Sequence, residues 1–256
     1  DITFTVNEDG TVDRVVMVDK PTHIVLSKKK ITNSEELPGA LLQVVDKDGN
    51  VVEEWISTDK PHEIVAKLVV DESYVLREVR PADGWAYAED VPFKVSHDGT
   101  VDYVKMEDKP THVVISKQEI TGSKELPGCT LQVIDKNGNV VDEWVSTDQP
   151  HEIKEKLIAD EEYTLREVRP ADGWAYAEDI PFKVSHDGTV DQVKMEDKPT
   201  HVVVSKKKIT GKEELPGCHL VIKDKNGNVV DEWTSSTIPH EIVAKLIAGE
   251  TYTLIE

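Results

Sequence analysis

The stretch Thr22-His-Ile-Val-Leu-Ser-Lys28 decides how this chain is organised, because it recurs at residues 111–117 and again at residues 200–206. The motif Glu-Leu-Pro-Gly recurs with the same offset of 89, at Glu36, Glu125 and Glu214. A unit of this length is the size of a domain and exceeds the roughly 20 to 50 residues of solenoid repeats. The sequence therefore predicts one small domain that is used several times in tandem.

Inside each repeat, apolar and polar residues alternate, and turn-forming residues come about every 8 to 14 positions. This pattern is typical of an all-β sandwich. The turns Lys47-Asp-Gly-Asn50 and His97-Asp-Gly-Thr100 are expected hairpins in which glycine supplies a positive φ. The strands expected in the first repeat are residues 23–28, 40–46, 51–57, 62–68, 73–79, 91–96 and 101–107.

The offset divides the chain into a first repeat (22–110), a second repeat (111–199) and a third repeat (200–256) that lacks its last strands. Residues 1–21 match the last strands of a repeat. The repeats join at the sequence Asp-Lys-Pro-Thr, beginning at Asp19, Asp108 and Asp197. Because these joints are short and contain proline but no run of Gly or Ser, we expect a stiff, extended rod.

The charge balance excludes several classes of partner. The chain has 30 basic and 50 acidic residues, a net charge of -20, so nucleic acid and anionic membrane surfaces are not expected partners. No apolar run approaches the roughly 18 residues that membrane insertion needs, and residues 1–6 lack the features of a signal peptide, so we expect a mature or excised segment. The two cysteines, Cys129 and Cys218, occupy equivalent positions where the first repeat has Ala40, and we expect small buried thiols without a disulfide.

Each repeat places a lysine, a glutamate and an aspartate on the apolar faces of three different strands. The sets are Lys28, Glu78 and Asp108 in the first repeat, Lys117, Glu167 and Asp197 in the second, and Lys206, Glu256 and Asp19 for the third. Charged side chains are rarely buried unless they are paired, so we expect the three to meet. The alternative stays open that each lies at a strand end and forms an ordinary salt bridge, because duplicated repeats are not independent observations.

Three such groups held together have a specific chemistry. A desolvated lysine can act as a neutral amine nucleophile, a protonated aspartic acid offers an electrophilic carbon, and a glutamate between them can move protons. Close positioning gives the amine a high effective concentration. The sequence therefore predicts a Lys–Asp isopeptide bond that forms with loss of water.

These residues carry a resemblance to a known family. Each repeat resembles a Cna B-type domain of the SpaA kind, found in the pili and adhesin stalks of Gram-positive bacteria. The matching stretches are Ile24-Val-Leu-Ser-Lys28, Glu36-Leu-Pro-Gly-Ala40, Tyr74-Val-Leu-Arg-Glu78, Pro81-Ala-Asp-Gly84, and Phe4-Thr-Val-Asn-Glu-Asp-Gly10 leading to Val16-Met-Val-Asp19. The resemblance implies tandem Ig-like or prealbumin-like β-sandwich domains, spontaneous isopeptide bonds with Glu78, Glu167 and Glu256 as the catalytic residues, and an extracellular protein attached to the cell wall. No cofactor and no metal is expected.

Other motifs have simpler interpretations. Asp46-Lys-Asp-Gly-Asn50 is too short for a calcium loop and is expected to be a hairpin turn. His62, His151 and His240 lack metal-ligand spacing and are expected at strand ends on the surface. Trp85-Ala-Tyr87 and Trp174-Ala-Tyr176 follow the Pro-Ala-Asp-Gly turn, where packing over the isopeptide site is favoured over a binding lip for sugar or peptide.

The function expected from these observations is a structural stalk of self-crosslinked domains beside other domains of the same surface protein. An enzyme acting on an external substrate is not expected, because the reactive groups are consumed in one turnover. The alternative is a repeated module that binds host matrix protein or glycan. For the third repeat we expect residues 1–21 of one copy to complete residues 200–256 of a neighbouring copy, with Asp19 beside Lys206 and Glu256. Two alternatives stay open, because they would have the same sequence: residues 1–21 are the remnant of a preceding domain, or the chain is a longer array trimmed at both ends.

Overall fold

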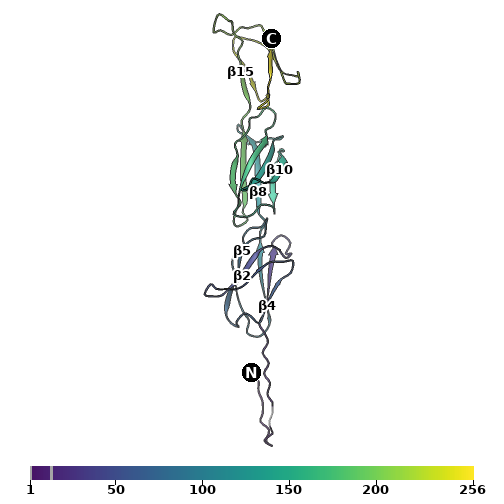
Figure 1. Ribbon diagram of the computed structural model, residues 1–256, viewed down its shortest axis with the longest axis vertical. Coiled ribbons are helices and arrows are strands. Elements are labelled where there is room, and N and C mark those ends of the chain that lie inside the picture. Colours follow the sequence, from purple (N-terminus) through teal and green to yellow (C-terminus); the bar gives the residue numbers. More distant parts are fainter. Residues whose placement is uncertain (1, 12–13) are drawn as a thin grey trace. The chain divides into compact units, whose positions relative to one another are not determined.

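The computed structural model describes residues 2–11 and 14–256 (Figure 1). All regular elements in these residues are β-strands, as the alternating pattern predicts. The contacts divide the chain into two units: unit 1 comprises residues 1–82 and 87–109, and unit 2 comprises residues 83–86 and 110–256. Across the described residues, no helix has the length and apolar character that a membrane span requires.

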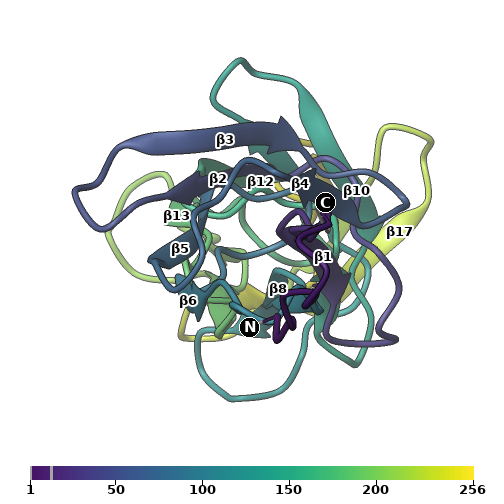
Figure 2. The ribbon, with the colours of Figure 1, turned by 90° about the horizontal axis from the view of Figure 1, so that it is seen from below.

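Unit 1 contains an antiparallel four-stranded sheet and a mixed three-stranded sheet that face each other. Strands β3, β2, β5 and β6 form one sheet in that order, and β4, β1 and β7 form the other. Figure 2 looks along these strands, with β3, β2, β5 and β6 following one another around one side and β1 and β4 across from them. The strands are β1 (His23–Lys30), β2 (Leu41–Val45), β3 (Val51–Ile56), β4 (His62–Val65), β5 (Ser73–Arg80), β6 (Val91–Lys94) and β7 (Val101–Asp108).

The core of unit 1 follows from the alternation along its strands. In β1, burial alternates from His23 to Lys28, so that Ile24 and Leu26 face the opposite sheet while their neighbours are half-buried. The same faces of β2, β5 and β7 contribute residues such as Leu42, Leu76 and Met106 to one continuous cluster. Side chains on alternate positions of a strand point to one side, so a single register decides which residues enter this core.

The first and last strands of the repeat lie side by side. Strand β1 pairs with β7 in parallel, with Lys28 opposite Met106 and Lys30 opposite Asp108. Strand β4 covers the other edge of β1 in antiparallel pairing. The end of the repeat is thus brought back next to its beginning, and this proximity positions the candidate site.

Unit 2 repeats this architecture in its first seven strands. Strands β10, β9, β12 and β13 form the four-stranded sheet, and β11, β8 and β14 the three-stranded sheet, with β8 and β14 parallel. The strands are β8 (His112–Glu119), β9 (Thr130–Asp135), β10 (Val140–Val145), β11 (His151–Lys154), β12 (Glu162–Arg169), β13 (Ile180–Lys183) and β14 (Val190–Asp197).

The third repeat supplies five further strands to unit 2: β15 (His201–Val204), β16 (His219–Lys223), β17 (Val229–Thr234), β18 (His240–Val243) and β19 (Thr253–Ile255). They form a β15–β18 pair and a β17–β16–β19 sheet, without counterparts of β13 and β14 in residues 200–256. Its apolar face is therefore open. Val202 is 40% exposed and Leu254 51%, whereas their equivalents Val113 and Leu165 in the second repeat are fully buried.

The segment before β1 has no strand among its described residues, 2–11 and 14–22 (Figure 1). Its large apolar side chains are exposed, among them Phe4, Val6 and Met17. Asp1 and residues 12 and 13, which belong to the expected last-strand segment 1–21, lie outside the described residues.

The expected strands agree with the observed ones apart from their ends. The largest difference is the expected strand 62–68, which ends at Val65 as β4. The physical reason is Ala66, whose φ of 56° turns the chain away from extended geometry. The predicted hairpin at Lys47-Asp-Gly-Asn50 is confirmed: β2 pairs with β3, Gly49 has φ 84°, and the Asp46 carboxylate accepts hydrogen bonds from the backbone N–H groups of Asp48 and Asn50. The hairpin predicted at His97-Asp-Gly-Thr100 is wrong, because the strands on either side of this turn, β6 and β7, pair with β5 and β1 in different sheets.

Candidate functional site

Three ionisable side chains meet in the core of unit 1. Lys28 comes from β1, Glu78 from β5 and Asp108 from the end of β7. The Lys28 Nζ lies 2.7 Å from Glu78 Oε1 and is in direct contact with Asp108 Oδ1. The three residues are only 2%, 7% and 0% exposed. The three side chains therefore meet in the core, as expected from the sequence. The alternative, in which each lies at a strand end and forms a solvent-exposed salt bridge, does not describe unit 1.

The Glu-Leu-Pro-Gly motif forms hydrogen bonds with the backbone of the lysine. The backbone N–H of Lys28 donates to the Glu36 carboxylate at 3.2 Å, and the backbone N–H of Leu37 donates to the Lys28 carbonyl at 2.6 Å. Glu125 and Glu214 accept in the same way from Lys117 and Lys206. In the sequence this motif marks the repeat and belongs to the stretches that carry the family resemblance, but its contact with the lysine was not predicted. Its constant spacing of eight residues from the lysine was the available signal.

The catalytic glutamate expected from the sequence is oriented by a backbone group. Glu78 Oε2 accepts a hydrogen bond of 2.8 Å from the backbone N–H of Ala88, and Glu167 Oε2 accepts an equivalent bond from Ala177. This bond leaves Oε1 facing the lysine. Sequence reasoning missed the donor, because a backbone N–H belongs to every residue except proline and leaves no mark in the residue pattern.

Burial changes the protonation of the aspartates. Loss of solvent raises the pKa of Asp108 to about 7. The Lys28 ammonium opposes this shift, and the neighbouring Glu78 carboxylate adds to it. The pKa of Asp197 is raised to about 6 for the same first reason, desolvation. A carboxyl group with such a pKa is substantially protonated in mildly acidic conditions, and the neutral acid is the form that an amine can attack.

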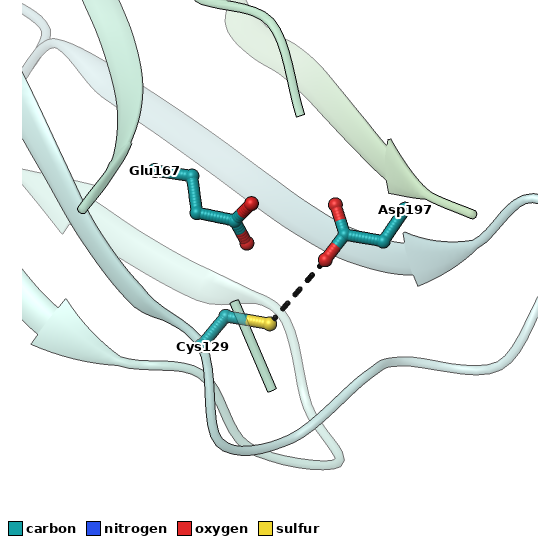
Figure 3. A group of neighbouring side chains, drawn as sticks. All are labelled: Cys129, Glu167 and Asp197. Carbon is teal, nitrogen blue, oxygen red and sulfur yellow. Dashed lines mark hydrogen bonds between the residues drawn. The ribbon is translucent and has the colours of Figure 1, made fainter. Parts of the chain in front are cut away.

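The second repeat holds an equivalent set with one addition. Lys117 Nζ lies 2.9 Å from Glu167 Oε1 and contacts Asp197 Oδ1, and all three residues are buried. The thiol of Cys129 lies in the same place, with its Sγ 3.7 Å from Asp197 Oδ2 (Figure 3). Burial raises the pKa of Cys129 to about 12. This contact was not foreseen from the sequence, which suggested only a small buried thiol.

The third repeat contains only part of the expected set. Lys206 Nζ lies 2.5 Å from Glu256 Oε2, but both side chains are in contact with solvent. The hydrogen bond to Lys206 is the main reason that the pKa of Glu256 lies below its ordinary value. Asp19, the third residue of the expected set, belongs to unit 1 and is exposed.

A metal ion does not fit the second site. Cys129, Glu167 and Asp197 place potential ligand atoms within 4.8 Å of one another (Figure 3). However, the Lys117 ammonium already contacts both carboxylates and neutralises charge at the position that a cation would occupy. The donor set therefore suits a lysine partner.

The repeated histidines have a structural role that was not predicted from the sequence. Each stacks on a tryptophan of the preceding strand; in the second repeat the ring centroids of Trp144 and His151 lie 4.1 Å apart. His151 Nε2 also lies 2.8 Å from Asp142 Oδ2. Since β10 and β11 belong to different sheets, this contact closes one edge of the sandwich. The constant spacing of seven residues between Trp and His was the available signal.

The ring of Trp85 is buried and that of Trp174 is partly buried, which favours packing over a binding lip, whereas packing over the isopeptide site stays a prediction. Trp85 is 4% exposed, and Trp174 packs against the core cluster of the second repeat. A binding lip made from these rings would need their faces in solvent. Of the aromatic residues in the second loop, Tyr176 is exposed.

The model of the SpaA prealbumin-like fold domain matches residues 22–110 and again residues 111–199. The chain belongs to this family. A search of curated proteins found no match. Among solved structures, the chain is similar to the Bacillus anthracis TIE protein, with 16% identity over 93% of this chain and 48% of that one and a TM-score of 0.45.

Two further similar structures are pilins. The shaft pilin SpaA from Lactobacillus rhamnosus GG is 13% identical over 71% of this chain and 98% of its own, with a TM-score of 0.33. A streptococcal ancillary pilin is 16% identical over 77% of this chain and 69% of its own, with a TM-score of 0.36. The SpaA-family chain spans about half the length of the TIE protein structure.

Proposed function

We propose that this SpaA-family chain is part of the stalk of a Gram-positive surface adhesin or pilus. The stalk lies outside the cell and is attached to the cell wall. Each complete repeat of the chain is closed by a Lys–Asp isopeptide bond. The observation that carries the proposal is the buried contact of Lys28 with both Glu78 and Asp108, repeated in the second repeat. A buried lysine with two carboxylates is costly as an ion cluster, whereas an amide removes two of the charges.

The reaction joins the chain's own residues. Lys28 first gives a proton to the Asp108 carboxylate. Its neutral Nζ then attacks the Asp108 carboxyl carbon, so that a C–N bond forms and a C–O bond breaks. Glu78 takes the proton from the nitrogen and delivers it to the departing oxygen, so that one water molecule leaves. Each site reacts once and consumes its lysine and aspartate, so the chain is not proposed to be an enzyme for external substrates.

The position of the bond suits a protein under tension. Force on a repeat enters through β1 and leaves through β7, which are neighbouring parallel strands. A bond from Lys28 to Asp108 connects these two strands directly. The residues between them, which make up most of the repeat, are then outside the force path and remain folded.

The open third repeat fits a donor strand from a neighbouring copy. Val6 and Met17 are exposed, yet with the offset of 89 they correspond to Val95 and Met106, which are both 1% exposed in the first repeat. The same offset places Asp19 at the position of Asp108. We propose that residues 1–21 of one copy cover the open apolar face of residues 200–256 in the next, with Asp19 beside Lys206 and Glu256.

Intact-mass measurement of the purified protein tests the bonds. We expect the mass to be lower by one water for each closed repeat, and replacement of Glu78 or Glu167 by alanine to restore one water each. An unshifted mass of the unaltered chain would show that no bond forms.

Denaturing gels test the link between copies. We expect a ladder of covalent multimers that Asp19→Ala abolishes while leaving the water losses of the first two repeats unchanged. A single monomer band from the unaltered chain at high concentration would contradict the linkage. The alternative role, binding of host matrix protein or glycan, has less support because Trp85 is buried.

A further inference from the structure

The two complete sites differ at one oxygen of the reacting aspartate. In the second repeat, Cys129 Sγ lies 3.7 Å from Asp197 Oδ2, within hydrogen-bonding range for sulfur (Figure 3). In the first repeat the equivalent residue is Ala40, and Asp108 Oδ2 is buried without a hydrogen-bond partner in the part of the chain that the structure describes. A buried carboxyl oxygen without a donor is unfavourable.

The backbone around this position is the same in both repeats. The N–H of Cys129 donates to the Ser146 hydroxyl at 2.9 Å, and the N–H of Ser146 donates to the Cys129 carbonyl at 2.8 Å. Ala40 makes the same two bonds with Ser57, at the same distances. The backbone geometry is therefore the same at the two positions, which differ in the sulfur atom. In the second repeat this geometry places the sulfur next to Asp197.

The thiol is available as a hydrogen-bond donor. Cys129 is fully buried, and the raised pKa of about 12 keeps its proton on the sulfur. Asp197 Oδ1 is in contact with the attacking lysine, so Oδ2 is the oxygen left for the thiol. An S–H group is a weak donor, but it gains strength when the acceptor becomes charged.

We propose that Cys129 is an auxiliary catalytic residue of the second repeat, whose S–H donates to the aspartate oxygen that becomes the amide carbonyl. The inference rests on the isopeptide reaction proposed above. When Lys117 Nζ bonds to the Asp197 carboxyl carbon, the C=O electron pair moves onto Oδ2, where the thiol hydrogen bond stabilises the negative charge. Oδ1, which carries the proton of the neutral acid, takes up the proton that Glu167 carries from the nitrogen and leaves as water. The C=O bond re-forms, and the thiol keeps its proton.

The rates of bond formation test this role, with the first repeat as an internal control. The full chain is made by cell-free translation, samples are stopped in acid at intervals, and the crosslinked peptides of each repeat are quantified by mass spectrometry. A hydrogen bond of ordinary strength corresponds to about fivefold in rate. We expect Cys129→Ala to slow the second repeat about fivefold and to leave the first unchanged, and Ala40→Cys to speed the first.

Cys129→Ser distinguishes an effect of hydrogen-bond donation on the rate from an effect of core packing, because serine keeps a donor group in a smaller side chain. We expect it to restore most of the rate lost in Cys129→Ala. As a folding control, the unfolding transition of Glu167→Ala should be measured with and without Cys129→Ala, and we expect the second repeat to fold in both cases. In the Cys218→Ser protein, the infrared S–H stretch of Cys129 should lie at the lower frequency of a hydrogen-bonded thiol.

The results that overturn the inference are distinct. An unchanged rate in Cys129→Ala removes the thiol from the reaction, and equal slowing in the alanine and serine variants with no gain from Ala40→Cys assigns its effect to packing. A free-thiol S–H frequency contradicts the hydrogen bond. Absence of water loss in both repeats of the unaltered chain refutes the proposed isopeptide function itself.

Discussion

Replacing Glu78 by glutamine should convert the first repeat from an inextensible to an extensible domain. Glutamine keeps the shape of the side chain, and its carbonyl oxygen can still accept the hydrogen bond that Ala88 gives to Glu78, but it cannot carry the proton that the reaction requires. The domain should therefore fold with Lys28 and Asp108 in contact and unlinked.

The expected change in length follows from the positions of the bonded residues. Lys28 and Asp108 are 80 residues apart in the sequence, which corresponds to about 270 Å of fully extended chain. With the bond in place, none of this length is released by pulling. Without it, unfolding of the first repeat should add nearly the full amount, less the short distance between the two strands in the folded state.

Single-molecule pulling with handles at the two ends of the chain measures this step. In the unaltered protein only the third repeat should extend, because it has no isopeptide bond within the chain. This extension should be the same in every variant. The Glu78→Gln protein should add one step, and the matched Glu167→Gln protein an equal one, because Lys117 and Asp197 are also 80 residues apart. The double variant should show two.

Two results would refute the reasoning. Steps of about 270 Å from both complete repeats of the unaltered chain would mean that their terminal strands are not covalently joined. An inextensible Glu78→Gln domain, with one water still missing from its mass, would mean that the bond forms without the glutamate.

Three further results are expected. Burial raises the pKa of Asp108 to about 7 and that of Asp197 to about 6, so the reactive neutral acid is present below these values and is lost as the pH rises through them. Timed mass spectrometry should therefore show that, as the pH is raised, the rate of bond formation declines first in the second repeat. In the unlinked Glu167→Gln background, His151→Ala should lower the unfolding free energy of the second repeat by about 1 to 2 kcal/mol in denaturant titrations, since it removes the contacts to Trp144 and Asp142; an unchanged midpoint would exclude the edge contact as a stabilising feature. A maleimide should label Cys218 of the native monomer but not the fully buried cysteine of the second repeat, and equal labelling of both would contradict the observed difference in burial.

The strands were predictable because each repeat has one face in the core and one in water. This alternation marks Ile24 and Leu26 as core residues and shows that Lys28 continues their face. The end of β4 was not predictable, because Ala66 adopts a positive φ without the glycine or asparagine that usually marks such a turn.

The identities of the three buried ionisable groups also followed from the pattern, since a charged residue on an apolar face is conspicuous in every copy. The groups that orient and tune them did not. Ala88 acts through its backbone N–H, and Cys129 has the character of an ordinary small core residue until its distance to Asp197 is known.

By itself, the sequence determined that this protein is an array of all-β repeats and which lysine, glutamate and aspartate side chains face inward, because period-two alternation is a local property of the chain. Only the tertiary structure decided that β1 and β7 are parallel neighbours, which residues complete each site, and how far burial shifts the aspartate pKa. Those features depend on atoms that are about 80 residues apart in sequence, and they exist only after both sheets have closed over the same core.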